Sequence, residues 1–217
     1  MKPVLILQHQ SPERPAYLVT WLEQHRIPYR TFSAGDGQDF PASIEPYAAL
    51  AVLGGGMSAN DDLASNRQAE QLIVQAMILD IPVIGHCLGA QLMTRALKGQ
   101  VTVSATPEIG WQPIEYADHE LARAWFGPTP TDTVIHWHYD TFSIPLGATL
   151  LASNSNCVNQ AWGFGKHLAM QFHIEIDEPK IDLWVSEDDD KWAQARSLFE
   201  SAQSRQTILD QIGRAHV

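Results

Sequence analysis

The stretch "PVIGHCLGAQLMTRAL", Pro82–Leu97, runs from a short β-branched segment through a cysteine into a helical pattern. Gly85 lies two residues before Cys87, and Gly89 lies two residues after it. This GxCxG spacing matches a nucleophile elbow, a strand, sharp turn and helix, with sulfur in place of oxygen. The helix N-terminus favours the reactive thiolate form. The stretch predicts a nucleophile held for attack at a strand-to-helix corner, and a buried structural cysteine is the alternative.

The residues before this corner predict an α/β fold. Apolar runs at Val4–Leu7, in "IPYRTF" and at Tyr47–Leu53 are typical of buried strands. Helical spacing separates them at Pro15–His25 and follows them at Gln68–Leu79. Strands without polar alternation, joined by helices, indicate a mostly parallel sheet covered on both faces, a three-layer arrangement.

The residues after the corner predict a β-rich second half. One brief helical piece is expected at His119–Trp125, and a final helical pattern at Lys191–Gly213. No Pro, Gly or Ser-rich linker divides the chain, so we expect one domain over residues 1–217. The strand-like segments are "QVTVSA", "IGWQPIEY", "TVIHWH", "TLLASN" and "HLAMQFHIEI".

The balance of acidic and basic residues restricts the classes of binding partner that are expected. The chain carries 14 Lys and Arg residues against 25 Asp and Glu, for a formal net charge of −11, without a local basic cluster. Nucleic acid and anionic membranes are therefore not expected as partners, whereas a small-molecule substrate or a protein is.

The N-terminal residues, the apolar stretches and the cysteines indicate the cellular compartment. The apolar run Val4–Leu7 is too short for a signal-peptide core, and no stretch approaches the roughly 18 apolar residues of a membrane span. Cys87 and Cys157 do not form a disulfide framework. We expect a cytoplasmic protein.

A base and its orienting group follow far along the chain, in "QFHIEI". His173 and Glu175 are two residues apart, so on a strand they share one face, while Phe172, Ile174 and Ile176 point into the core. The carboxylate can then fix the imidazole tautomer and stabilise the imidazolium that forms when His173 takes the thiol proton. A solvated strand face is the alternative for this pair taken alone.

Oxyanion donors are expected from "AVLGGGMSAND", in which three glycines follow a buried strand. Active-site loops of open parallel sheets emerge at such strand ends. We assign one donor to the amide of Gly56 and the other to the amide of Leu88, the residue after the nucleophile. A simple turn is the alternative for the glycine run, and no phosphate-binding pattern is completed.

Taken together, these motifs resemble the class I glutamine amidotransferases, most closely the glutaminase portion of GMP synthase and its stand-alone relatives. The resemblance covers Val52–Ile176 and implies a flavodoxin-like core. The matching segments are "VLGGG" from Val52, "IGHCLGAQL" from Ile84, "EIGW" from Glu108, "WHYDTFSIP" from Trp137, "NQAW" from Asn159 and "QFHIEI" from Gln171.

The resemblance implies a triad of Cys87, His173 and Glu175. In that family the cysteine attacks the γ-carboxamide of glutamine, forms a γ-glutamyl thioester and releases ammonia before water completes the hydrolysis. His173 is expected to act first as base toward the thiol, then as acid toward the leaving nitrogen, then as base toward water. No cofactor or metal is expected.

The resemblance also implies substrate-binding positions. Gln91, one helical turn from Cys87, corresponds to a residue that helps hold the substrate. His138 and Asp140 correspond to the family's His-Gly-Asp segment beside the glutamine pocket. Tyr139 stands where the family usually has glycine, so the backbone near the amino-acid end of the substrate is expected to differ.

GMP synthase activity is not carried over, because these 217 residues contain no SGGxDS-type loop of an ATP pyrophosphatase domain. Two expectations follow. Either a separate synthase subunit accepts the ammonia, or the protein works alone as a γ-glutamyl peptidase or hydrolase.

Two rival functions are kept. His136 and His138 form an HxH pair that, with His173 and Glu175, would give a metal shell of three histidines and one carboxylate. The other rival is a regulatory protein that keeps the fold without turnover, since fold alone does not imply function. Against the second rival, all three triad residue types are present.

Overall fold

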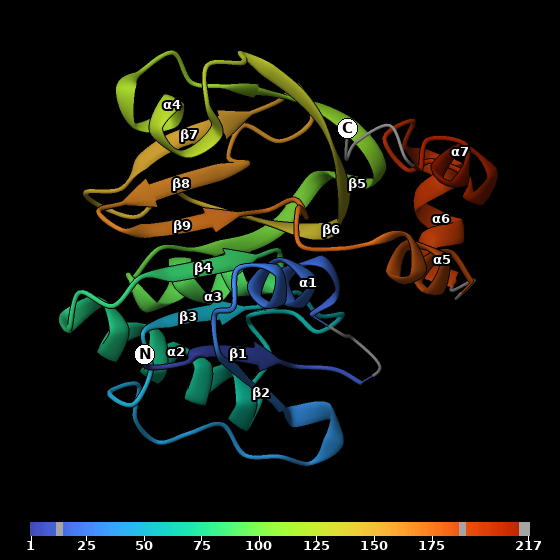
Figure 1. Cartoon of the computed structure of the whole chain (residues 1–217). Helices are drawn as coiled ribbons and strands as arrows, with labels where there is room; N and C mark the ends of the chain where they lie inside the picture. The colour runs from blue at the N-terminus through green and yellow to red at the C-terminus, as the bar shows by residue number, and fades with distance from the viewer. Residues whose placement is uncertain (12–14, 187–189, 213–217) are drawn as a thin grey trace.

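The computed structural model describes residues 1–11, 15–186 and 190–212. Within these residues, nine strands join one sheet (Figure 1). The strands are β1 (Val4–Gln8), β2 (Tyr29–Ser33), β3 (Ala49–Val52), β4 (Val83–His86), β5 (Val101–Tyr116), β6 (Thr131–Phe142), β7 (Thr149–Ser153), β8 (Ala161–Phe164) and β9 (His167–Met170). The helices are α1 (Ala16–Gln24), α2 (Ala64–Ile78), α3 (Leu88–Ala96), α4 (Glu120–Phe126), α5 (Glu178–Ser186), α6 (Asp190–Leu198) and α7 (Arg205–Leu209), with a 3-10 helix at Ala34–Asp36.

The sheet has a parallel part and an antiparallel part. Its strand order is β2-β1-β3-β4-β9-β8-β7-β5-β6. Strands β2, β1, β3, β4 and β9 run parallel to one another, and the pairings from β9 through β8, β7 and β5 to β6 are antiparallel. The predicted α/β class is confirmed, and the β-rich second half extends the first sheet instead of forming another.

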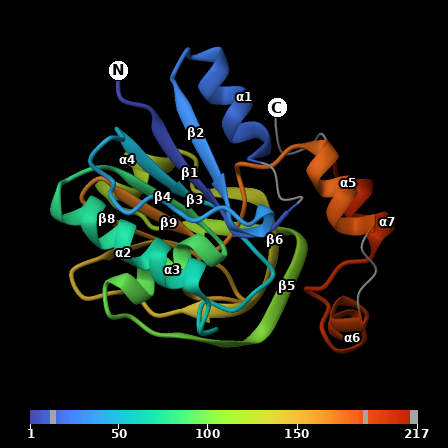
Figure 2. The ribbon, with the colours of Figure 1, turned by 90° about the horizontal axis from the view of Figure 1, so that it is seen from below.

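Helices cover both faces of the parallel part. Figure 2 shows α1 on one side of the strands and α2 with α3 on the other. Leu5 and Leu7 of β1 belong to the core cluster that includes α2 and α3, while Ile6 packs with Leu22 of α1. A strand buried on both faces needs apolar residues at successive positions, which explains the unbroken run in β1. The three-layer prediction is confirmed.

The last three helices pack on β5 and β6, beyond the carboxyl ends of the parallel strands (Figure 1). Hydrogen bonds of two tryptophans hold α6 and α7 in place. The indole N–H of Trp111 in β5 donates to the carbonyl of Ile208 at 3.0 Å, and that of Trp192 in α6 donates to the carbonyl of Gln203 at 3.1 Å. These helices therefore form one wall at the edge where active sites of parallel sheets lie.

The prediction for this final segment was partly wrong. Over the described part of Lys191–Gly213 the chain forms two helices, α6 and α7, because Ser204 starts a new helix by accepting the N–H of Thr207. Helix α5 was not predicted. None of the helices in the described residues is long and apolar enough to cross a membrane.

Two strand predictions also differ from the structure. The segments "QVTVSA" and "IGWQPIEY" join into the single long strand β5, whose pairing with β6 is irregular between Val103 and Glu108. The last predicted strand ends early, at Met170, and β8 was not predicted. Beyond it the N–H of His173 donates to Ile135 of β6 at 3.0 Å, so the chain leaves β8 and β4 and crosses to β6. Ile174, expected in the core, is 40% exposed.

Candidate active site

Cys87 lies at the corner between β4 and α3, with backbone angles of φ 50° and ψ −110°. This left-handed conformation is rare and costly for a residue with a side chain, and such strain is typical of functional positions. A Cβ atom on Gly89 would lie 2.0 Å from the carbonyl oxygen of Val52, and one on Gly85 would lie 2.6 Å from the Met93 sulfur. Both glycines are thus required for α3 to pack against β3 and β4.

His173 and Glu175 meet beside the thiol. The Nδ1 atom of His173 lies 2.8 Å from Oε1 of Glu175, and the ring also makes a hydrogen bond with Cys87. All three side chains are buried. Because Nδ1 is directed at the carboxylate, Nε2 is the nitrogen available to exchange a proton with sulfur. The structure therefore brings the three predicted triad positions together, although on a bend and not on the strand that the spacing predicted.

Charge within this group holds the histidine protonated. Burial alone would lower the pKa of His173, but the Glu175 carboxylate and the contacts with Cys87 outweigh burial and raise that pKa to about 10. Burial alone would raise the pKa of Glu175, and the neighbouring rings of His86 and His173 lower it well below its usual range. The pair is accordingly an imidazolium and a carboxylate near neutral pH.

His86 is a neighbour of the triad that sequence reasoning left unassigned. Its Nε2 lies 3.7 Å from Oε2 of Glu175, and burial lowers the pKa of its ring below the ordinary value. Within the described residues, the two ring nitrogens of His86 have no hydrogen-bond partner, and Oε2 of Glu175 has none either. The position directly before the nucleophile was the only sequence signal, and it does not reveal the carboxylate that the ring faces.

The glycine loop after β3 borders the triad. A Cβ atom on Gly54 would lie 2.9 Å from Cε1 of His173. The N–H of Gly56, a predicted oxyanion donor, donates to Oε1 of Gln10 at 2.6 Å. Leu88, the other predicted donor, is the first residue of α3, where backbone N–H groups have no acceptor within the helix. Gln10 was missed because nothing in its local pattern indicates a contact with a loop 46 positions away.

A cavity of about 530 Å³ opens over these groups. Cys87, His173 and Gly56 line it together with Gln91, whose Nε2 donates to Gln171 at 3.3 Å. The wall formed by α5 and α6 adds Trp184 and Lys191, which sequence reasoning also missed. Lys191 belongs to the final predicted segment and Trp184 to α5, which was not predicted; the course of these helices over the strand ends does not follow from periodicity.

His138 and Asp140 also line the cavity, but their polar atoms are engaged elsewhere. In the His138 ring, Nδ1 lies 3.0 Å from the carbonyl of Asp140 and Nε2 lies 3.0 Å from Oε2 of Glu108. The Asp140 carboxylate accepts a hydrogen bond from the Ser58 hydroxyl at 2.8 Å. This bond joins the glycine loop to β6. The substrate-binding roles of both residues stay predictions.

The sequence model of the family Glutamine amidotransferase class-I matches residues 37–181, more than half of the chain. The chain belongs to this family. The match spans the elbow, the glycine loop and the His173–Glu175 pair, so the three predicted catalytic positions all lie inside the matched residues.

Similar proteins agree with this membership. A glutamine amidotransferase-like protein of Salmonella typhimurium, YfeJ, is 29% identical over 197 residues, covering 87% of this chain and 82% of that protein. A glutamine-hydrolyzing GMP synthase of Bacillus pumilus is 32% identical over 173 residues, 73% of this chain and 32% of the synthase. This amidotransferase thus spans about a third of that synthase's length.

A solved structure extends the agreement to the whole fold. The crystal structure of a glutamine amido transferase from Methylobacillus flagellatus is 35% identical in sequence. It matches this amidotransferase with a TM-score of 0.93, over 98% of this chain and 87% of that one. The α5 to α7 wall is therefore included in the shared fold.

The metal shell considered from the sequence is not assembled in this amidotransferase. His173 contacts both Glu175 and Cys87, whereas His136 and His138 lie with Glu108. Among the described residues, Glu108, His136 and His138 are the group whose ligand atoms lie close enough to share an ion. The HxH pair thus belongs to a separate cluster.

Proposed function

We propose that this amidotransferase hydrolyses the γ-carboxamide of glutamine, or of a related γ-glutamyl amide, through a thioester on Cys87. One observation carries the proposal. Cys87, His173 and Glu175 form a continuous buried chain of contacts whose thiol end opens into the 530 Å³ cavity. A nucleophile, a base within reach of it and a group orienting the base are the requirements of acyl transfer.

In the first half-reaction, Nε2 of His173 holds the proton removed from Cys87, and the thiolate attacks the amide carbon. Glu175 stabilises the resulting imidazolium. The tetrahedral intermediate collapses, the carbon–nitrogen bond breaks, and His173 returns the proton to the departing nitrogen, which leaves as ammonia. In the second half-reaction His173 takes a proton from water, whose oxygen attacks the thioester and releases glutamate and the thiol.

The negative oxygen of each intermediate needs donors. Gly56 and Leu88 are proposed for this role, and each such donor contributes about 10²- to 10³-fold to the rate. Because the N–H of Gly56 is bonded to Gln10, the Gln10 side chain must give way when the substrate oxygen arrives. Gln91, His138 and Asp140, which all line the cavity, remain the proposed contacts for the rest of the substrate.

A γ-glutamyl peptidase or hydrolase is the second candidate. The cavity is larger than a single amino acid requires and falls in the range of sites for drug-sized ligands, about 300–1,000 Å³. Trp184, Tyr139 and Lys191 also line the cavity. They give room for a leaving group larger than ammonia.

The fate of the ammonia is a separate proposal. The glutamine-hydrolyzing GMP synthases that resemble this chain are much longer than it is, so a separate synthase subunit is a proposed partner for ammonia transfer. Release of ammonia to solvent is expected if the protein acts alone as a hydrolase.

A glutaminase assay beside a panel of γ-glutamyl peptides tests the proposal, with Cys87→Ala as the inactive variant and Cys157→Ala as the matched thiol control. We expect Cys87→Ala to abolish turnover and Cys157→Ala to preserve it. A preference for peptides over glutamine identifies the hydrolase. Equal rates for wild type and Cys87→Ala on every substrate would refute the thioester mechanism.

A further inference from the structure

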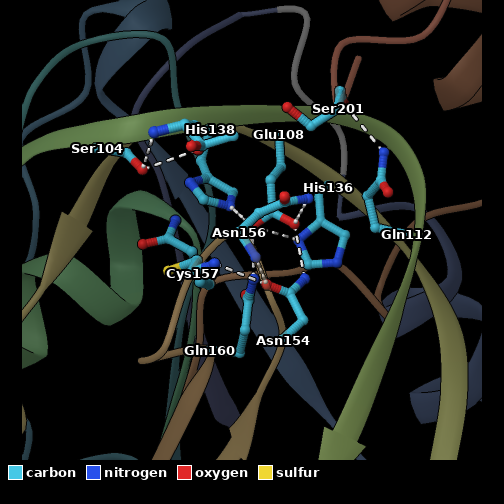
Figure 3. A network of polar contacts seen from close by, with 12 residues as sticks. Ser104, Glu108, Gln112, His136, His138, Asn154, Asn156, Cys157, Gln160 and Ser201 are labelled. Atoms are coloured by element: carbon cyan, nitrogen blue, oxygen red, sulfur yellow. Dashed lines mark hydrogen bonds and ion pairs between the residues drawn. The ribbon is translucent and has the colours of Figure 1, made fainter. Parts of the chain in front are cut away.

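We propose that Glu108, His136 and His138 form a binding site for a divalent transition-metal ion such as zinc, separate from the Cys87 triad. One ligand atom from each residue lies within 4.8 Å of the other two. Figure 3 shows the three side chains converging between β5 and β6. The two histidines are the HxH pair of the sequence, which takes no part in the contacts between Cys87, His173 and Glu175.

Strand geometry makes this convergence a built feature. His136 and His138 are two residues apart on β6 and so project from the same face. Glu108 is paired directly with His138 across the β5–β6 ladder. All three side chains are buried, with Glu108 and His136 fully excluded from solvent and His138 2% exposed.

The His138 ring requires a positive species beside it. Its Nδ1 lies 3.0 Å from a backbone carbonyl, that of Asp140, and its Nε2 lies 3.0 Å from the Glu108 carboxylate. Both oxygens only accept hydrogen bonds. When Nδ1–H donates to the carbonyl, the lone pair of Nε2 faces the carboxylate, so either a proton or a cation must lie between them. Metal-bound histidines commonly donate their other ring N–H to a backbone carbonyl in this way.

The surroundings of His136 favour a bound cation over a proton on His138. Its Nδ1 lies 4.0 Å from the same Glu108 oxygen, and among the described residues neither of its ring nitrogens has a hydrogen-bond partner. If a proton on His138 fills the gap, the ring nitrogens of the buried His136 still have no hydrogen-bond partner, which is costly. A metal ion between the three residues gives His136 a bond as well.

The separations fit a small ion. Ligand atoms about 2.1 Å from a tetrahedral ion lie roughly 3.4 Å apart. The observed distances from the Glu108 oxygen are 3.0 Å to His138 and 4.0 Å to His136, one below and one above that value. Two imidazoles and a carboxylate are typical zinc or iron ligands.

Side-chain amides orient the carboxylate from outside (Figure 3). Asn154 donates to Oε1 of Glu108 at 2.6 Å, and Gln160 donates to Oε2 at 2.6 Å. Such outer hydrogen bonds are a regular part of metal sites. Oε1 of Gln160 has no partner among the described residues.

The site acts on structure, since its three ligands are buried and only His138 among them lines the cavity. It ties β5 to the part of β6 that borders the cavity, where the carbonyl of Trp137 lies 3.5 Å from the Cys87 sulfur. Bound metal is therefore expected to hold the cavity wall without touching the substrate.

The test uses untagged protein in a Cys87→Ala background, so that the thiol cannot bind the metal. The protein is stripped with chelator and dialysed against zinc, bound zinc is measured by mass spectrometry, and the melting temperature is recorded. We expect about one zinc ion per chain and a rise in melting temperature of several degrees. His136→Leu is expected to lose the zinc, and His25→Leu, an exposed histidine, to retain it.

Cobalt replaces zinc in a second measurement that needs no further variant. Bound cobalt should show visible absorption of a tetrahedral nitrogen and oxygen site, without a sulfur charge-transfer band. Folded Cys87→Ala protein that retains no zinc and gives no cobalt spectrum overturns the proposal and leaves a proton between His138 and Glu108. Zinc retained equally by His136→Leu overturns it too.

Discussion

Gln10 and Gly56 place a carboxamide oxygen on the backbone N–H where the substrate oxygen is proposed to bind. The substrate must displace this contact. A neutral hydrogen bond of this kind contributes about 0.5–1.5 kcal/mol. We therefore expect Gln10→Ala to raise kcat/KM for glutamine by about 2- to 10-fold, measured by steady-state ammonia release. Gln71→Ala, on an exposed face of α2, is the control, and a fall in activity in Gln10→Ala would mean that Gln10 supports the loop.

Glu175 is the residue whose charge keeps His173 protonated after proton transfer. Replacing Glu175 by Gln preserves the shape and removes the charge. We expect Glu175→Gln to lower kcat by about 10²- to 10⁴-fold, with little change in circular dichroism. Glu178→Gln, an exposed glutamate three residues later, should behave as wild type. An activity loss shared by both variants would contradict the role assigned to Glu175.

The residues of the site differ in how far they could be predicted. The spacing of His173 and Glu175 predicted that the two share one face, and the resemblance to the glutamine amidotransferases implied that this pair meets Cys87. The partners of the surrounding groups were not predictable. Gln10 reaches Gly56 and His86 faces Glu175 only because separate loops meet at the sheet edge. The hydrophobic periodicity of a single helix or strand does not indicate such long-range contacts.

The elbow between β4 and α3 depends on close approach of backbone to backbone. Gly89 is a helical glycine, and glycine-to-alanine changes in helices usually stabilise by about 0.5–1 kcal/mol. Here the added Cβ atom would lie 2.0 Å from the Val52 carbonyl oxygen of β3. We expect Gly89→Ala to lower the free energy of unfolding in urea by about 1–3 kcal/mol or more, and an unchanged value would show that α3 can shift freely.

Elements with a strong pattern were predicted and those decided by long-range pairing were not. The buried strands β1, β3 and β4 follow from unbroken apolar runs. The end of β9 does not, because the chain turns from β8 toward β6 when His173 pairs with Ile135. Phe172 and Ile176 stay buried on the bend, so two of the three core positions expected there are confirmed and Ile174 is not.

At the scale of the whole molecule, the ion pair of His173 and Glu175 makes stability depend on pH. His173 has its pKa raised from 6.5 to about 10, so its contribution is complete below pH 6.5 and is lost as pH rises toward 10. The pKa of Glu175 is lowered from 4.5, so its contribution is present above pH 4.5 and is lost in acid.

We therefore expect the melting temperature of the wild type to exceed that of Glu175→Gln most between pH 4.5 and 6.5. The gap should narrow steadily as pH approaches 10. Thermal denaturation of both proteins from pH 5 to 10 measures it, and a gap that stays constant over this range would contradict the assigned charges.

The topology adds a consequence for how the protein acquires its activity during synthesis. Among the described strands, β9 is the last to be made, yet it lies inside the sheet between β4 and β8. The backbone N–H of Cys87 donates to the carbonyl of Met170 in that strand. His173, the proposed base, follows three residues later in the chain. Contacts so distant in sequence form late in folding. A nascent chain thus carries its thiol without a base, and insertion of β9 is the step that both closes the sheet and activates the nucleophile.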